Sequence, residues 1–208
     1  MSKTMKVKEK EKILEFATKK FLKEGFHKTT MDSISSEIHM SKKTIYKYFP
    51  TKERLIESII DNTQKENRIF INKIVSSKDN FIKVLISLLV FYQKDISRTG
   101  ENWIKDLKIH MPHLWNKVQN FNNTIIIPAI EKFIKKGKKE KYIRNIPTPI
   151  IIKTTESIIE TICDTEFAIN NKLSIQDIFH HNIDVLLNGL LTQKVKLESN
   201  NSNKYLSF

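Results

Sequence analysis

The chain has 208 residues, 39% of them hydrophobic and 28% charged, which is the composition of a soluble globular protein with a sizeable core. Its 36 lysines and arginines outnumber 23 acidic residues, and the net charge of +13 favours a polyanionic partner, either nucleic acid or an anionic membrane surface. Lysine, isoleucine and asparagine abound while glycine is scarce, as in proteins of AT-rich genomes, so the placement of the lysines is more informative than their number.

Cysteine content and hydropathy exclude two further classes of protein. Cys163 is the only cysteine, so no intramolecular disulfide can form, and a reducing cytoplasm suits the chain. The longest apolar stretch, residues 81–92, contains Lys83 and falls well short of the ~20 residues of a spanning helix. We therefore expect a cytoplasmic protein with no membrane segment and no signal peptide.

Helical periodicity dominates the chain. Four glycines and five prolines leave little turn chemistry, so the sequence predicts an all-α fold of about nine helices. Residues 1–8 are expected to form a frayed basic arm, and contact of this arm with a DNA minor groove is the alternative. The first helix is predicted over 9–24, where apolar residues recur every four positions, and Gly25 ends it as a left-handed cap.

Residues 29–55, TTMDSISSEIHMSKKTIYKYFPTKERL, predict two short helices joined by a tight turn, followed by the start of a longer helix. Thr29 or Thr30 caps the first, and Asp32 would complete a capping box with Thr29. Ser41 caps the second, and a proline ends it after about residue 49. This is how a chain presents a helix to the major groove of DNA.

The second short helix should turn its polar residues outward. Ile45 and Phe49, four residues apart, anchor it inward, and the other faces carry Lys42, Lys43, Thr44, Tyr46 and Lys47. Lysine can neutralise phosphate or donate to guanine, while threonine methyls and tyrosine rings can touch thymine methyls. The alternative is an ordinary helical hairpin whose lysines are only solvated.

These residues resemble the TetR/AcrR family of bacterial transcriptional regulators. The resemblance covers roughly residues 10–60: the first helix, its break at Gly25-Phe26, the string TTMDSI, and above all SKKTIYKYFPTKERL. By this resemblance, Thr30 and Lys52 grip backbone phosphates, and Tyr48 touches phosphate. The same resemblance implies contacts to bases or phosphates from five further residues: Lys42, Lys43, Thr44, Tyr46 and Lys47.

The chain departs from the family pattern at two positions. Ser35 stands where the family usually has alanine, and it is small enough to keep the helices close. His39 occupies the turn where the family usually has glycine. That position tends to need a positive φ, so we expect a slightly strained turn and an intact fold.

Further helices are predicted from Thr51 to beyond residue 70, and over 78–98, 102–111, 114–136, 149–169 and 174–192, with a kink at Pro128 and a loop before Pro149. We divide the chain into a three-helix DNA-binding domain at residues 1–51, a helical ligand-binding and dimerisation domain at 52–195, and a disordered tail at 196–208.

By resemblance, the C-terminal domain binds a small inducer and forms a homodimer through its last two helices. Apolar stripes along those helices are consistent with a four-helix interface, although they also describe the core of a monomer. The stripe residues are Ile151, Ile158, Ile162, Ile175, Phe179, Ile183, Leu186, Leu187 and Leu190.

The signal for a ligand pocket is weaker. Large amphipathic residues between the fourth and seventh helices favour a largely apolar small-molecule effector, although each of them also suits a plain core. The candidate ligand-binding residues are Phe91, Trp103, His110, Trp115 and Phe121.

Other constellations give little chemistry, and we predict no metal, cofactor or catalytic residue. His110 and His113 are close in sequence but lack a third ligand, and Pro112 lies between them. The four-residue spacing of Glu156, Glu160 and Asp164 suits a cation site or, more simply, a solvated stripe. The basic run of residues 132–144 is either a second nucleic-acid or lipid patch or the solvated end of a helix.

The sequence thus predicts a homodimeric, ligand-responsive transcriptional regulator. We expect a repressor without enzymatic activity that binds a palindromic double-stranded DNA operator and is released by a small molecule. Three alternatives stay open: a non-specific architectural DNA-binding protein, a regulator controlled by a protein partner, and a helical enzyme or metal-binding protein whose helix-turn-helix is vestigial.

Overall fold

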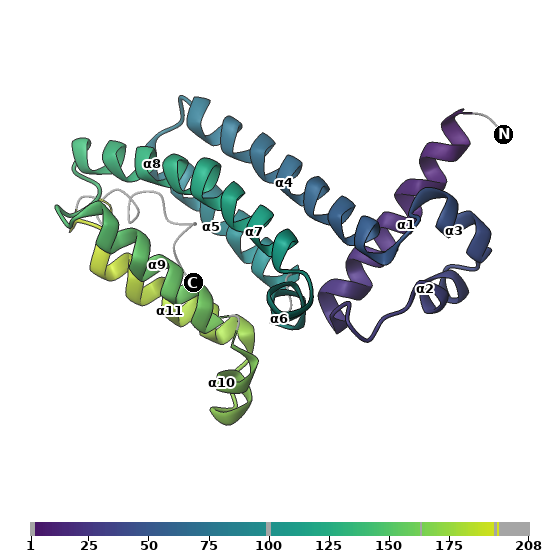
Figure 1. Ribbon diagram of the computed structural model, residues 1–208. Helices are drawn as coiled ribbons and strands as arrows, with labels where there is room; N and C mark the ends of the chain where they lie inside the picture. The colour runs from purple at the N-terminus through teal and green to yellow at the C-terminus, as the bar shows by residue number, and fades with distance from the viewer. Residues whose placement is uncertain (1–2, 99–100, 163, 194, 196–208) are drawn as a thin grey trace. The chain divides into compact units, whose positions relative to one another are not determined.

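The computed structural model describes residues 3–98, 101–162, 164–193 and 195 (Figure 1). Within these ranges the chain is helical and has no strand, apart from one isolated antiparallel bridge between Ile143 and Leu191. The all-α prediction is confirmed. The elements are α1 (Lys3–Glu24), α2 (Met31–Glu37), α3 (Lys42–Tyr48), α4 (Lys52–Ser76), α5 (Phe81–Arg98), α6 (Glu101–His110), α7 (Pro112–Phe121), the π-helical η1 (Asn122–Ile126), α8 (Ile127–Lys139), α9 (Thr148–Ile162), α10 (Thr165–Asn170) and α11 (Ile175–Leu190).

Most helix boundaries lie within about three residues of the sequence prediction, and three regions differ more. The expected basic arm is helical from Lys3 onward and belongs to α1. The helix expected over 114–136 is interrupted by η1, because Pro128 has no N–H to donate to the preceding turn and instead lies in the first turn of α8. The helix expected over 149–169 ends at Ile162, because Asp164 caps a new helix, α10.

Contacts divide the chain into two compact units. The first consists of Met1–Ile69 and Arg98–Phe121, and the second of Phe70–Ser97 and Asn122–Phe208. Helices α6 and α7 therefore pack with α1–α3, although they lie about 50 residues further along the chain, and α4 contributes to both units. The functional division at residue 51 remains a prediction, since a compact unit is defined by packing and not by what it binds. The expected tail lies outside the described residues.

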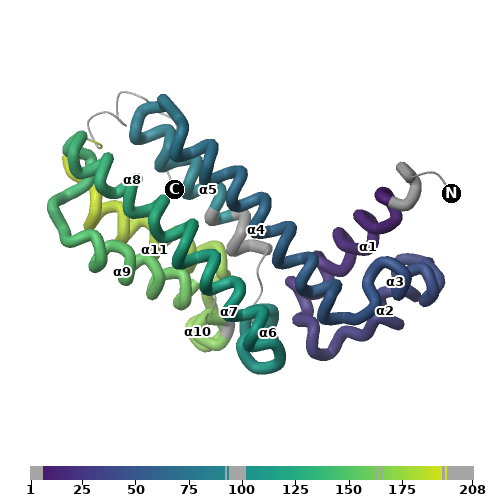
Figure 2. The backbone as a smooth tube through the Cα atoms, turned by 45° about the horizontal axis from the view of Figure 1, so that its top comes forward, coloured from purple at the N-terminus to yellow at the C-terminus, as the bar shows by residue number. Residues whose placement is uncertain are grey.

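The core of the first unit joins the predicted DNA-binding helices to α6. Phe21 of α1 and the loop residue Phe26 are both buried, and their rings lie 6.4 and 5.4 Å from that of Trp103 on α6. Leu107, one turn further along α6, is also buried. Figure 2 shows α2 and α3 side by side next to α1, with α3 leading into α4. The core that supports the helix-turn-helix therefore includes buried side chains of α6.

The core of the second unit is built from α5, α8, α9 and α11. The buried ring of Phe81 stacks on Phe133 at 4.6 Å and on Tyr142 at 4.9 Å. Gly137 permits this approach, since a Cβ atom there would lie 2.5 Å from Phe81 and 2.8 Å from Ile143. No helix in the described ranges has the length and apolar character needed to cross a bilayer.

Candidate nucleic-acid interface

Thr30 begins the first helix of the motif. Its Oγ1 accepts a hydrogen bond from the Ser33 N–H at 3.0 Å, and the Ser33 hydroxyl accepts one from the Thr30 N–H at 3.3 Å. The capping box therefore pairs Thr30 with Ser33, and the expected pairing of Thr29 with Asp32 is wrong. Thr29 is buried and donates its hydroxyl to the carbonyl of Gly25, so it satisfies the end of α1 instead.

The turn between α2 and α3 has the predicted strain. His39 adopts a φ of 54°, in the left-handed region, which confirms the expectation for this position. The Met40 N–H donates to the carbonyl of Ser35 at 3.0 Å and closes the turn. Ser35 is buried, and its hydroxyl donates to the carbonyl of Asp32 at 2.9 Å, so serine is tolerated at this tight contact between helices.

Ser41 starts α3 as predicted. Its Oγ accepts a hydrogen bond from the Thr44 N–H at 3.1 Å and shares another with the Thr44 hydroxyl at 2.8 Å. Ile45 and Phe49 are buried, with 0% and 1% of their surfaces exposed. Because these anchors fix the helix, four candidate DNA contacts lie on its exposed faces: Lys42, Lys43, Tyr46 and Lys47. The contacts themselves remain predictions.

Two of the candidate contacts already have acidic partners. The Nζ of Lys42 lies 2.6 Å from the Oδ2 of Asp32, and this hydrogen bond raises the pKa of Lys42. The Tyr48 hydroxyl donates to the carboxylate of Glu9 on α1 at 2.6 Å, and this bond raises the pKa of Tyr48. If Lys42 and Tyr48 bind DNA, each must therefore break its hydrogen bond to the carboxylate or keep that bond while it makes a second one to DNA.

Lys52, at the start of α4, has an internal role that the sequence did not reveal. Its ammonium group donates to the carbonyls of Phe26, His27 and Thr29 at 2.8, 3.3 and 3.0 Å. A lysine has three N–H donors, so all of them have acceptors within the protein. Partial burial lowers the pKa of Lys52. The phosphate contact expected of Lys52 stays a prediction, since it requires one of these bonds to be given up.

Helix α6 holds the same loop from its other side. The Oδ2 of Asp106 accepts a hydrogen bond from the His27 N–H at 2.7 Å. Gly25 has a φ of 78°, as expected of a left-handed cap, and a Cβ atom there would lie 2.7 Å from that same oxygen. The loop between α1 and α2 is therefore fixed by Lys52 of α4 and Asp106 of α6.

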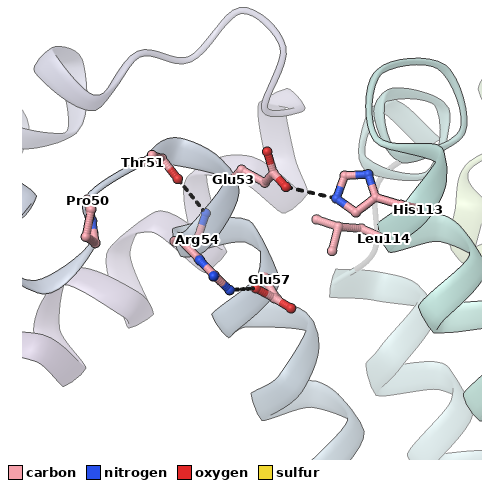
Figure 3. Close-up of a pocket in the computed structure, with 7 residues that line it drawn as sticks. All are labelled: Pro50, Thr51, Glu53, Arg54, Glu57, His113 and Leu114. Carbon is pink, nitrogen blue, oxygen red and sulfur yellow. Dashed lines mark hydrogen bonds and ion pairs between the residues drawn. The ribbon is translucent and has the colours of Figure 1, made fainter.

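A pocket lies between the first turns of α4 and α7 (Figure 3). The Nε2 of His113 is 2.9 Å from Glu53, and Arg54 pairs with Glu57 at 2.7 Å. Lys117, one turn further along α7, bridges Glu57 and Asp61 at 3.0 and 2.6 Å. Arg54 and Glu57 are a local i, i+3 pair, but His113 and Lys117 lie about 60 residues from their partners, so no local sequence signal could have paired those. The lining residues are Pro50, Thr51, Glu53, Arg54, Glu57, His113 and Leu114.

The five candidate ligand residues do not form one cluster in the structure. Trp103 is buried among Phe21 and Phe26, and the His110 ring stacks on His27 at 3.8 Å. The Nζ of Lys108 lies 5.0 Å from the centre of the Trp115 ring, and the Cζ of Arg68 lies 5.4 Å from the centre of the Phe121 ring. Phe91 belongs to the other unit and stacks on Phe70 at 3.9 Å. None of the five lines the pocket of Figure 3.

The other candidate sites have ordinary structural roles. His110 and His113 face different partners, and the part of the chain that the structure describes holds no group of three or more His, Cys, Asp or Glu that could bind a metal. Asp164 caps α10 by accepting a hydrogen bond from the Phe167 N–H at 2.9 Å, which separates it from the stripe expected with Glu156 and Glu160. Cys163 lies outside the described residues.

The apolar stripes of the last helices serve mainly the protomer's own core. The stripe residues buried there are Ile151, Ile162, Phe179, Ile183 and Leu187. Two apolar side chains of α11 stay exposed, Ile175 of the predicted stripe at 44% and Val185 at 71%, and a Cβ atom added to Gly189 would meet no neighbour within 4 Å. Most of the predicted stripe thus lies in the core, and dimerisation through the last two helices remains a prediction.

Comparison with known proteins identifies the motif. Residues 13–59 match the family model of bacterial regulatory proteins of the tetR family. The HTH-type transcriptional regulator YvaF of Bacillus subtilis is 22% identical over 83% of this chain and 91% of its own length. The nucleoid occlusion factor SlmA of Shewanella baltica is 24% identical over 80% and 89%.

Solved structures share the fold along most of the chain. A TetR-family transcriptional regulator from Agrobacterium tumefaciens has a TM-score of 0.71 at 11% identity, covering 90% of this chain and all of that one. The SmeT–triclosan complex has a TM-score of 0.65 at 12% identity, covering 89% and 92%. The helix-turn-helix of residues 13–59 is therefore that of the tetR family of bacterial regulatory proteins, and most of the chain shares the fold of TetR-family transcriptional regulators.

Proposed function

We propose that the protein is a homodimeric repressor that binds a palindromic operator and leaves it when a small molecule binds. The observation that carries this proposal is α3, a helix capped by Ser41, anchored by Ile45 and Phe49, and exposed on its remaining faces. The residues proposed to contact DNA are Thr30, Lys42, Lys43, Thr44, Tyr46, Lys47 and Tyr48, with Lys52 as a phosphate contact or a positioning residue.

A second copy of the chain is the proposed partner of α11. On this helix Ile175 and Val185 are exposed and the space around Gly189 is open, so a second helix could approach closely there. Packed across a two-fold axis with α9, this helix would set the two recognition helices about one DNA turn apart, ~34–36 Å. A palindromic operator follows from that symmetry.

The proposed effector is a largely apolar small molecule. Support comes from the fold shared with SmeT, whose structure was solved as a triclosan complex. Helix α4 starts directly after the recognition helix and ends in the second unit, so a ligand that displaces its far end would also move α3. Linkage then requires operator DNA to weaken effector binding by the same factor.

A non-specific DNA-organising role is the second candidate. It is favoured by the net charge of +13 and by the similarity to a nucleoid occlusion factor. This candidate predicts equal affinity for operator and random DNA, whereas a repressor predicts a preference of roughly 10³-fold or more at physiological salt. In either role the protein would act in the cytoplasm as a DNA-binding protein without catalysis.

The discriminating experiment measures binding to the DNA upstream of the protein's own gene and to a shuffled duplex of equal length. We expect protection of a palindromic segment in a footprint, strong preference over the shuffled duplex, and a particle of twice the 24.5 kDa chain mass in light scattering. Equal affinity for both duplexes would overturn the repressor proposal in favour of the second candidate.

A further inference from the structure

One acidic side chain forms an ion pair with a lysine of the recognition helix. Asp32 is in the first turn of α2, and its carboxylate lies 2.6 Å from the ammonium of Lys42, the first residue of α3. Both side chains are more than half exposed. No acidic residue lies in the first turn of α3 itself, so Asp32 is the negative charge supplied to this helix end by α2.

We propose that Asp32 is a specificity-determining residue, which restrains Lys42 from binding DNA that offers only phosphates. The proposal rests on the proposed function, in that α3 is taken to enter the major groove. It adds that one of the lysines there acts as half of an ion pair and not as a free cation. Asp32 therefore lowers the affinity for random sequence more than the affinity for the operator.

The physical reason is the chemistry of the two possible targets. Phosphate oxygens only accept hydrogen bonds, so Lys42 reaches a phosphate either by leaving Asp32 or by bringing a carboxylate close to the negative backbone. Each route removes the gain from counterion release that a free lysine would give. A base pair differs, because its major-groove edge carries donors as well as acceptors.

A suitable base pair satisfies both members of the ion pair. The cytosine N4 amino group donates to a carboxylate, and guanine O6 and N7 accept from a lysine. A G·C pair presents these groups side by side, so Lys42 and Asp32 can bind it together without separating. The other exposed lysines of α3, Lys43 and Lys47, pair with no carboxylate among the described residues and suit phosphates.

The test compares Asp32→Asn with Glu15→Gln. Glu15 pairs with Lys19 at 2.8 Å on α1, both are exposed, and the substitution removes the same charge from a lysine that is not a predicted DNA contact. Affinities for the upstream DNA and for a shuffled duplex are measured by fluorescence anisotropy over a range of potassium chloride concentrations. Thermal denaturation confirms that each variant is folded, and Asp32→Ser replaces D32N if D32N is unstable.

We expect D32N to bind the shuffled duplex about two- to fivefold more tightly per subunit, with a salt slope steeper by about one per subunit, because Lys42 then neutralises a phosphate. The preference for upstream DNA should fall. The control E15Q should change these quantities by less than half as much. In a Lys42→Met background, D32N should have no further effect.

Equal effects of D32N and E15Q would overturn the proposal, since only total charge would then matter. So would a D32N effect that persists without Lys42. Failure of the underlying regulatory function looks different: the parent protein would itself bind both duplexes equally, whatever the variants do.

Discussion

Replacing Lys52 by methionine tests whether α4 positions the DNA-binding motif. Methionine keeps the length and apolar stem of the side chain but removes the ammonium that donates to the carbonyls of Phe26, His27 and Thr29. The loop that carries these carbonyls connects α1 to α2, and Asp106 of α6 also holds it by accepting a hydrogen bond from the His27 N–H. We therefore expect K52M to loosen this loop.

The size of the effect follows from the three hydrogen bonds. A hydrogen bond to a charged group contributes about 1.5–3 kcal/mol, but three bonds to one ammonium do not add in full. Partial burial of the ammonium, which lowers the pKa of Lys52, offsets some of the gain. We expect K52M to lower the free energy of unfolding of the first unit by about 2–3 kcal/mol.

Urea denaturation followed by tryptophan fluorescence measures this effect. The chain has two tryptophans, Trp103 and Trp115, and both lie in the first unit, so the signal reports on that unit. Lys65→Met, at an exposed position of the same helix, is the matched control and should change stability by less than ~0.5 kcal/mol. A K52M effect as small as that of the control would refute the positioning role.

The same variant decides the phosphate contact expected of Lys52. If Lys52 grips a phosphate, K52M lowers the salt slope of DNA binding by about one per subunit contact. If its donors remain on the loop, the slope is unchanged and affinity falls only through stability. An unchanged slope would remove Lys52 from the set of DNA contacts.

Three further predictions concern the same unit. His39→Gly relieves the positive φ and should raise the Tm by about 1–4 °C, whereas a clear drop would show that glycine's extra freedom when unfolded dominates. Hydrogen bonds from Lys117 and Arg54 lower the pKa of Glu57 from its ordinary value. The stability that Glu57 contributes is therefore present above its ordinary pKa and is lost as the pH falls through the lowered pKa. Glu57→Gln should weaken this loss of stability at acid pH, as measured by urea titrations at several pH values. Thr44→Ala should relax base preference in a selection from random duplexes, and an unchanged preference would exclude base contact.

Local signals in the sequence identified the helix-turn-helix well. Ser41, His39 and Gly25 each need a particular backbone conformation or cap, and that need can be recognised from the residue type and its near neighbours. Asp164 shows the limit of such signals. An aspartate four residues after Glu160 fits an acidic helical stripe and also fits an N-cap, and only tertiary packing decides that it begins α10.

Contacts between distant segments could not be predicted in this way. Lys52 meets carbonyls 23 to 26 residues away, and His113 meets Glu53 across 60 residues. Carbonyl acceptors are identical at every residue, so a sequence gives no indication of which of them a lysine will find. The burial of Trp103 could not be predicted for a similar reason, because an aromatic residue suits a ligand pocket and a core equally well and only its neighbours in the fold distinguish the two.

The burial of Trp103 constrains where an effector can bind. Its ring packs on Phe21 and Phe26, and 7% of the residue is exposed, so a ligand in contact with the indole would have to displace part of the core that supports α1 and the recognition helix. Removing a large aromatic residue from such a core costs about 3–5 kcal/mol, a substantial share of the stability of a small domain. Among the candidate ligand residues, Phe91 can be engaged without this cost, because it stacks on Phe70 within the second unit. An effector that releases DNA by moving α4 is therefore better sought around Phe91 than around Trp103.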